Sequence, residues 1–398
     1  MSPDTTPQMS ATLEILAALV GFDTTSRHSN LALIDWIEAY LTRHGIAAHR
    51  TPDPTGQKAS LFASIGPKEQ QGYVLSGHTD VVPVDGQVWA SDPFTLSVRD
   101  GKAYGRGAVD MKGFLACCLA AVPAMVMAPL IKPIHLALSY DEEVGCVGVR
   151  PMLHRLAEGA FGIASPLAAF IGEPTSMNVV IGHKGKRSIR VRVRGSHAHS
   201  SLAPLYVNAV EFGARLVGFI RDQAERLAAT GARDDLYDIT HSTAHVGIFS
   251  GGTALNIVPA SAEIVYEYRV IAQDDADALV EEARAYARDV LEPKMRSVDP
   301  ASGIDFEVYT SFSGLDTEPG APVVSLAKRL AGRNGHSKVA FGTEAGLFTA
   351  IAGIPAVVIG PGSIEPAHKA DEFIGLDDLA QCNRFLARLV AEACGSTG

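Results

Sequence analysis

Residues 73–80 read YVLSGHTD, an apolar run that leads directly into a histidine and an aspartate. Three later apolar runs also end in acidic or glycine-rich clusters, at residues 134–138, 168–171 and 356–359. Continuous apolar runs of this length are typical of strands that are buried on both faces of a parallel sheet. The carboxyl ends of parallel strands lie at one edge of a sheet, where ligands bind. We therefore predict a mainly parallel α/β domain whose polar clusters converge on one site.

The pattern changes at residue 182, after which strands with one wet face alternate with helices. The predicted strands cover residues 189–193, 262–270 and 304–309, and the predicted helices cover residues 208–227 and 274–290. This order differs from the continuous apolar runs on either side and is typical of an α+β domain. We therefore assign residues 182–313 to an inserted domain, and residues 1–181 and 314–398 to the parent domain.

The composition narrows the function class. A formal net charge of −10 argues against nucleic acid as the main partner, because phosphate binding needs an excess of lysine and arginine. The five cysteines form no CxxC pair, and the first residues have no positively charged leader, which together favour a cytoplasmic protein. The longest apolar stretch, residues 116–131, is interrupted by Pro123 and Pro129, so we expect no membrane span.

Five imidazole or carboxylate side chains border glycine or proline at the ends of predicted strands. They are His78, Asp110, Glu143, Glu173 and His368. Taken singly, a histidine of this kind is more often a core residue, and a Glu-Glu pair is usually a solvated surface. Taken together, they are costly to bury without a cation, and two imidazoles with three carboxylates suit a pair of zinc-like ions. Asp110 is the natural bridging ligand, because one carboxylate can give an oxygen to each ion.

Two further acidic residues flank these candidates. Asp80 lies two residues after His78 and can accept a hydrogen bond from the second imidazole nitrogen, which would fix the tautomer. Glu142 directly precedes Glu143, and neighbours on an extended segment point in opposite directions. One glutamate can therefore bind metal while the other faces the substrate. We predict that Glu142 is the general base of a metal-assisted hydrolysis.

Four segments that carry these residues resemble the M20 metallopeptidase family, and the resemblance extends in order over essentially the whole chain. The segments are SGHTDVVP at 76–83, GRGAVDMKG at 105–113, DEEVG at 141–145 and GEPT at 172–175. The resemblance implies a catalytic α/β domain, an inserted lid domain that forms a homodimer, and two Zn²⁺ or Co²⁺ ions per subunit. Both ions would share Asp110. His78 and Glu173 would complete one site, and Glu143 and His368 would complete the other.

The resemblance also implies roles for residues outside the metal ligands. His199, in the segment GSHAHSS at 195–201, matches a lid histidine that reaches into the partner subunit and stabilises the tetrahedral oxyanion. Asn256, Arg269 and Thr343 are candidates for contacts with the substrate. Without the resemblance, Asn256 would be interpreted as a turn residue and Arg269 as the partner of a salt bridge at a strand end.

Within the family, three segments are most similar to enzymes that deacetylate acetylornithine: residues 140–151, 342–348 and 360–368. This similarity implies hydrolysis of N2-acetyl-L-ornithine to L-ornithine and acetate, a step of arginine biosynthesis. The alternatives within the family are a succinyl-diaminopimelate desuccinylase and a general N-acyl-amino-acid deacylase. A succinyl substrate needs a cation for its second carboxylate, which Lys184 or Arg187 could supply. A binding protein with a decayed metal site is a further alternative, against which the intact ligand set argues.

Overall fold

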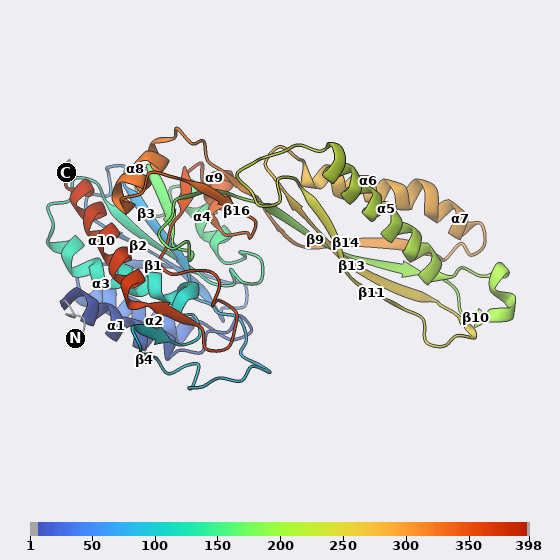
Figure 1. The fold of residues 1–398 in the computed structure, drawn as a ribbon, viewed down its shortest axis with the longest axis horizontal. Coiled ribbons are helices and arrows are strands. Elements are labelled where there is room, and N and C mark those ends of the chain that lie inside the picture. Colours follow the sequence, from blue (N-terminus) through green and yellow to red (C-terminus); the bar gives the residue numbers. More distant parts are fainter. Residues whose placement is uncertain (1–6, 396–398) are drawn as a thin grey trace. The chain divides into compact units, whose positions relative to one another are not determined.

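The computed structural model describes residues 7–395, which form two compact units (Figure 1). The first unit comprises Met1–Gly182, Leu315–Lys338 and Thr343–Gly398. The second unit comprises His183–Gly314 together with Val339–Gly342. The sequence placed the change of domain at residues 182 and 314, and it gave no sign that the short segment Val339–Gly342 belongs with the second unit.

The four apolar runs of the sequence form the middle of the large sheet in the first unit. They are β3 (Tyr73–His78), β6 (Ile134–Ser139), β7 (Ala168–Ile171) and β17 (Ala356–Val358). Their order in the sheet is β6-β3-β7-β17, and each is parallel to its neighbour. Every residue in these four strands is buried. The predicted mainly parallel α/β fold is therefore confirmed.

The remaining strands of the first unit extend this sheet or form a small second one. The nine-stranded sheet of the described chain also contains β1 (Ala48–Pro52), β2 (Ala59–Ile65), β8 (Val180–His183), β15 (Leu315–Asp316) and β16 (Ser337–Val339). A three-stranded sheet consists of β4 (Ser97–Arg99), β5 (Lys102–Tyr104) and β18 (Phe373–Gly375). Strands β2 and β8 pair antiparallel with the parallel centre, so the sheet is mixed at its flanks.

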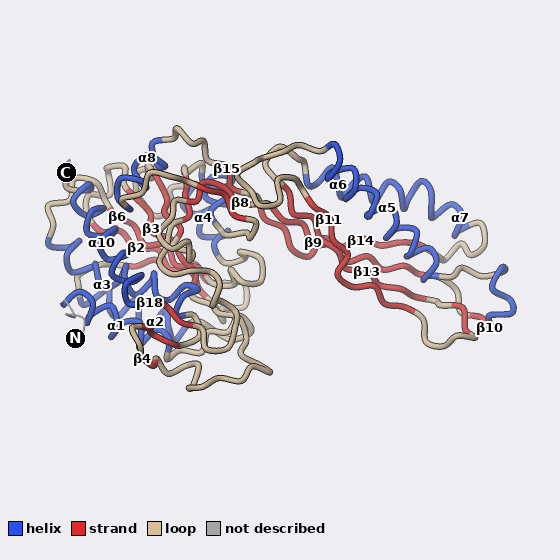
Figure 2. The backbone as a smooth tube through the Cα atoms, in the orientation of Figure 1, coloured by secondary structure: helices blue, strands red, loops and turns tan. Residues whose placement is uncertain are grey.

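Helices pack on this sheet and on one another (Figure 2). They are α1 (Pro7–Val20), α2 (Leu31–Arg43), the π-turn η1 (Ala108–Lys112), α3 (Gly113–Met127), α4 (Val149–Ala157), α8 (Pro322–Ala331), α9 (Ala345–Ala352) and α10 (Leu376–Ala393). Helices α1 and α10 both pack against α3, and their apolar faces join those of β3 and β7 in one core.

Helix α3 corrects one expectation from the sequence. The continuous segment Ala108–Met127 has 20 residues and is long and apolar enough to cross a membrane, although Pro123 lies inside the helix. The sequence analysis took Pro123 to interrupt the apolar stretch, whereas the helix continues through this residue. In the structure 83% of the most apolar 18-residue stretch of this segment is buried. Met111 and Leu115 pack closely against Gly77 of β3. Its apolar residues thus belong to the core of the first unit.

The second unit has a four-stranded antiparallel sheet covered on one face by helices (Figure 2). The sheet order is β11 (Thr243–Gly251), β13 (Ser261–Val270), β9 (Gly185–Arg194), β14 (Gly303–Phe312). The helices are α5 (Ala209–Thr230), α6 (Ala276–Tyr286), the π-turn η3 (Ala287–Leu291) and α7 (Glu292–Arg296). A two-stranded sheet of β10 (Ala198–His199) and β12 (Ile257–Val258) lies beside the 3₁₀-helix η2 (Ser200–Leu205). The three predicted strands correspond to β9, β13 and β14.

Strand β11 was not predicted from the sequence. It forms an edge of the sheet, and none of its residues is buried. The alternation of buried and exposed side chains that identifies β9 and β13 is therefore absent, and Gly247 interrupts the run. This edge strand has no visible signature because it has no face that is fully covered.

Gly172 provides a test of the packing beneath the site. A Cβ atom at this position would lie 2.0 Å from Cδ1 of Phe114, a buried residue of α3. We expect Gly172→Ala to lower the free energy of unfolding by about 1–3 kcal/mol, because the ring cannot move without displacing the core. Gly218, in the middle of α5, has nothing within 4 Å of such a Cβ atom. Gly218→Ala should therefore stabilise the protein slightly. Urea titration of both variants measures the difference, and equal stability would contradict this account.

Candidate metal centre

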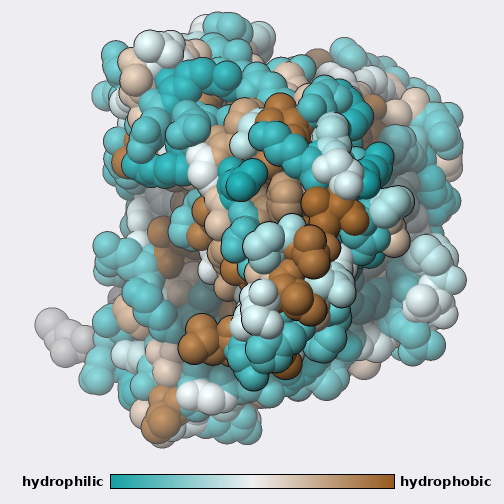
Figure 3. Space-filling view, turned by 90° about the vertical axis from the view of Figure 1, so that its right-hand side faces the viewer, coloured by the Kyte–Doolittle hydropathy of each residue, from teal (hydrophilic) through white to brown (hydrophobic). Residues whose placement is uncertain are grey.

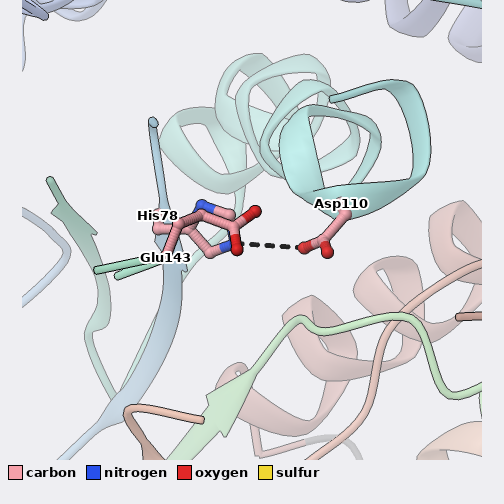
Figure 4. A group of neighbouring side chains, drawn as sticks. All are labelled: His78, Asp110 and Glu143. Carbon is pink, nitrogen blue, oxygen red and sulfur yellow. Dashed lines mark hydrogen bonds and ion pairs between the residues drawn. The ribbon is translucent and has the colours of Figure 1, made fainter. Parts of the chain in front are cut away.

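The five predicted ligands lie together in the first unit. His78 is the last residue of β3, and Glu173 follows β7 after one glycine. Asp110 lies in η1 at the beginning of the α3 region, Glu143 in the loop after β6, and His368 in the loop before β18. Figure 4 shows His78, Asp110 and Glu143 directed toward one another. The five side chains therefore converge as predicted, but not all of them come from strand ends, because Asp110 lies in η1 and His368 in a long loop.

Asp110 connects the two histidines. Its Oδ1 lies 3.1 Å from Nε2 of His78, and its Oδ2 lies 3.1 Å from Nε2 of His368. Oε1 of Glu173 lies 3.9 Å from the same nitrogen of His78, and Oε1 of Glu143 lies 3.2 Å from that of His368. The donors thus form two sets of three that share one carboxylate. Nitrogen and oxygen donors in this number fit two zinc-like ions with room for further ligands.

The two donor sets differ in exposure. His78 is fully buried and Asp110 is only 6% exposed, whereas the side chain of His368 is 51% exposed. The set that contains His368 is therefore the one that solvent and small molecules reach. Catalytic metal sites keep such an accessible side, while structural sites are closed.

The carboxylates repel one another in this buried cluster. Burial raises the pKa of Glu142 to about 8, and burial together with Asp110 raises the pKa of Glu173 well above its ordinary value. Hydrogen bonds with Asp110 and Glu143 raise the pKa of His368 to about 10. Burial alone would raise the pKa of Asp110, but hydrogen bonds from His368 and His78 lower it below its ordinary value. The site is therefore built to attract positive charge.

Asp80 does not act as the sequence predicted. Nδ1 of His78 donates to the backbone carbonyl of Asp80 at 2.9 Å, whereas the Oδ1 atom lies 3.6 Å away. The carboxylate instead accepts the backbone N–H groups of Glu142, at 3.1 Å, and Glu143, at 3.4 Å. It also accepts the hydroxyl of Ser26 at 2.7 Å. Asp80 therefore fixes the imidazole tautomer through its main chain and holds the glutamate loop through its side chain.

Glu142 and Glu143 are neighbours in sequence and lie in different groups of possible ligands, although His78 belongs to both groups. Ligand atoms of Glu142, His78 and Glu173 all lie within 4.8 Å of one another. Glu143 lies within the same distance of His78 and Asp110, and its Oε1 also contacts His368. Cys146 Sγ donates to Oε1 of Glu142 at 3.3 Å, a contact that the sequence did not indicate.

Asp141, which precedes the two glutamates, has a positive φ of 54°. Nζ of Lys58 lies 2.5 Å and 2.7 Å from the two oxygens of Asp141 and holds this turn. The role of Lys58 was also absent from the sequence analysis, because its partner is 83 residues away.

The predicted lid residues lie in the second unit. His199 is exposed on β10, and its Nδ1 lies 2.8 Å from the hydroxyl of Ser201. The carbonyl of Asn256 accepts the N–H of Ser200 at 3.0 Å, so Asn256 and His199 belong to the same paired segment. Nε of Arg269 is 3.0 Å from Oε1 of Glu267, which is the salt bridge of the simpler interpretation.

Thr343, the remaining substrate-contact candidate, lies in the first unit and is fully buried. Its hydroxyl accepts the N–H of Ala345 at 3.0 Å, at the beginning of α9. In this structure the side chain of Thr343 is therefore engaged in capping a helix.

Metal uptake is expected to release protons. With a pKa raised to about 10, the imidazole of His368 carries a proton at pH 7 in protein prepared without metal. A metal ion binds only the neutral imidazole, so the apparent affinity for Zn²⁺ should rise as the pH rises toward that pKa. Calorimetry in buffers of different ionisation enthalpy measures the number of protons released. His368→Asn should release about one fewer proton, and a binding enthalpy independent of the buffer would contradict the prediction.

Comparisons with known proteins identify the family of this chain. The model of peptidase family M20/M25/M40 matches residues 74–392. An acetylornithine deacetylase from Myxococcus xanthus is 34% identical over 400 residues, which cover 98% of this chain and 99% of the relative. Another from Photorhabdus laumondii is 31% identical and covers 97% and 96%. A solved M20 family metallo-carboxypeptidase from Sulfolobus solfataricus has a TM-score of 0.76 at 19% identity, covering 96% and 99%. The chain belongs to peptidase family M20/M25/M40 and is a hydrolase of that family.

Proposed function

We propose that this chain hydrolyses the amide bond of N2-acetyl-L-ornithine to L-ornithine and acetate, a step of arginine biosynthesis. Two relatives that match almost end to end are named acetylornithine deacetylase, which supports this substrate. A cytoplasmic location is part of the proposal. It is supported by the five cysteines, all of which are free thiols, as is usual in a reducing compartment.

The main observation behind the proposed metal-dependent hydrolysis is that the two oxygens of Asp110 face two different histidines, His78 and His368. Asp110, His78 and Glu173 would hold one Zn²⁺ or Co²⁺ ion, and Asp110, Glu143 and His368 would hold the other. Such a pair supplies a Lewis acid for the substrate carbonyl and lowers the pKa of water. The protein's own contribution is to fix the donors and to exclude solvent from the side of His78, which is fully buried.

Glu142 is the residue that would move the proton. Its carboxylate lies within 4.8 Å of the ligand atoms of His78 and Glu173. We assign it the role of base rather than that of a third ligand beside them. As general base it would take a proton from the attacking water, and as general acid it would pass that proton to the leaving amine. The thiol of Cys146 and the loop anchored by Asp80 hold this carboxylate in place.

The contacts of Lys184 and Arg187 support the proposal of an acetyl rather than a succinyl group. The two cations considered for a second carboxylate already have partners. Nζ of Lys184 donates to the carbonyls of Ile239, at 2.8 Å, and His241, at 2.5 Å. Arg187 forms a two-pronged contact with Asp277 at 2.7 Å and 2.9 Å. Neither side chain is therefore available to bind a succinyl carboxylate without first losing its own partner.

The role of Glu142 can be tested directly. Glu142→Gln should keep its metal content but lose about 10²–10⁴-fold in turnover, because it removes the proton carrier and leaves the ligands intact. Turnover of N2-acetyl-L-ornithine and metal analysis of the same preparation provide the measurement. Glu158→Gln, which changes an exposed glutamate at the end of α4, is the matched control. A panel that includes N-succinyl-diaminopimelate and other N-acetyl amino acids tests the substrate, and a preferred succinyl substrate would overturn that part of the proposal.

We further propose that the enzyme is a homodimer formed through the second unit. The edge strand β11 presents unpaired backbone groups, and such edges favour pairing with a symmetric copy. Exposed apolar side chains accompany it on the second unit: Leu202, Leu205, Ile248, Phe249 and Leu255. Figure 3 shows apolar side chains in a band between hydrophilic ones, on the side where Figure 1 labels β10 and α7. His199, exposed on β10, is the residue proposed to act on the acyl oxygen in the partner's site.

Subunit complementation tests the dimer. His199→Ala and Glu142→Gln should each be nearly inactive, since loss of one oxyanion donor typically costs about 10²–10³-fold in turnover. After mixing and subunit exchange, a mixed dimer has one complete site and one site that lacks both groups. About a quarter of the wild-type activity is then expected, because half of the dimers are mixed. If exchange is proven by mass and the mixture stays inactive, His199 does not act across the dimer.

A further inference from the structure

A buried ion pair lies beside the candidate metal centre, and neither of its members is a metal ligand. Nη1 of Arg106 is 2.7 Å from Oε2 of Glu372, and both side chains are only 1% exposed. Removing two charges from water is costly unless their remaining hydrogen-bonding atoms also find partners. Nε of Arg106 has no partner among the described residues, whereas both Nη atoms and both oxygens of Glu372 have one. These contacts indicate what the pair does in the fold.

The second oxygen of Glu372 holds the backbone of the bridging ligand. Oε1 accepts the N–H of Val109 at 3.0 Å and the N–H of Asp110 at 3.2 Å. Asp110 has φ −122° and ψ 88°, which is not a helical conformation, although it lies in η1. Helix hydrogen bonds therefore do not define the main chain at this residue, and Glu372 supplies acceptors in their place.

Arg106 extends the same network to the last ligand. Its Nη2 donates to Oε1 of Gln87 at 2.6 Å, and its Nη1 donates to the carbonyl of Lys369 at 3.3 Å. Nε2 of Gln87 in turn donates to the carbonyl of His368 at 2.9 Å. His368 has a positive φ of 63°, which is uncommon for a residue with a side chain and is favoured here by the contacts of its main chain.

We infer that the Arg106–Glu372 pair is a positioning device for the metal centre. Glu372 holds the main-chain N–H of Asp110 in position. Arg106 positions Gln87, which holds the main-chain carbonyl of His368. The two ligand atoms concerned, Oδ2 of Asp110 and Nε2 of His368, lie 3.1 Å apart and belong to the same donor set. The pair thus fixes the separation of two ligands before a metal ion arrives, and this inference rests on the proposed metal binding.

The test is the affinity of the whole protein for Zn²⁺, measured by competition with a chromophoric chelator and without substrate. Glu372→Gln keeps the size of the side chain but weakens its hold on the two N–H groups and on Arg106. Loss of a group that orients a metal ligand typically reduces metal affinity by about 10–100-fold. We expect a loss of this size in Glu372→Gln.

Glu292→Gln is the matched control in the second unit. Glu292 is 9% exposed, accepts the N–H of Ile304 at 2.9 Å and pairs with Arg296 at 2.8 Å. Like Glu372, Glu292 accepts a backbone N–H group and pairs with an arginine, but it contacts no proposed metal ligand. This variant should lose thermal stability and keep the zinc affinity of the wild type. A zinc affinity of Glu372→Gln within twofold of the wild type would overturn the inference.

A second variant covers the case in which Glu372→Gln does not fold. Gln87→Ala removes a partly exposed side chain and leaves the Arg106–Glu372 pair in the core. It should weaken zinc binding several-fold at an unchanged melting temperature, and unchanged binding would also overturn the inference. If the wild-type protein itself binds no Zn²⁺, the proposed function is wrong. If the wild type, Glu372→Gln and Gln87→Ala all bind Zn²⁺ with the same affinity, the positioning role is wrong and the proposed function is unaffected.

Discussion

The candidate centre depends on one carboxylate that faces two imidazoles. Each carboxylate oxygen of Asp110 lies 3.1 Å from the Nε2 atom of one histidine, His78 or His368. The end of β3 and the loop before β18 must therefore both lie next to η1. Three further carboxylates gather within this small volume, those of Glu142, Glu143 and Glu173. Such a concentration of like charge is unfavourable in a buried place unless cations share it. The crowding of carboxylates therefore explains why the site favours cations, whereas burial is the main reason that the pKa values of Glu142 and Glu173 are raised.

The sequence was sufficient to predict the parts of the site that follow directly from strand ends. His78 and Glu173 come at or just after buried runs, and a parallel sheet necessarily brings such positions to one edge. The inserted α+β block was visible because β9 and β13 alternate buried and less buried side chains. Strand β11 was invisible because it has no buried residue, and alternation is the only local signal of a strand of that kind.

What the sequence could not provide was the path of the loops. Spacing alone suggested that the carboxylate of Asp80 would meet His78, yet the chain turns so that the carbonyl does so instead. The residues that hold the ligand-bearing loops in place are also distant from them in sequence. Glu372 and Asp110 are 262 residues apart, and Lys58 and Asp141 are 83 residues apart. No periodicity connects such pairs, so only the folded chain reveals them.

Two non-ligand carboxylates perform the same task on different loops. Asp80 accepts the N–H groups of Glu142 and Glu143, and Glu372 accepts those of Val109 and Asp110. In both cases the acceptor binds the main chain of a ligand rather than its side chain.

The physical reason lies in the irregular backbone of the site. Asp141 and His368 have positive φ values, and Asp110 is not helical, so regular hydrogen bonds of sheet or helix do not define these residues. Side chains replace them: Glu372 accepts the N–H of Asp110, and Gln87 donates to the carbonyl of His368. The ligand oxygens of Asp110 and Glu143 face the imidazoles of His78 and His368 instead. The anchoring carboxylates of Asp80 and Glu372 add negative charge to a site that is already acidic. Arg106 and Lys58 offset part of it, and both are bound to the carboxylates of the anchors and turns rather than to the ligands. Among the described residues, the ligand carboxylates of Asp110 and Glu143 therefore face the two ligand imidazoles rather than a lysine or an arginine. A metal ion can displace the protons of these imidazoles, which suits the site to cation binding.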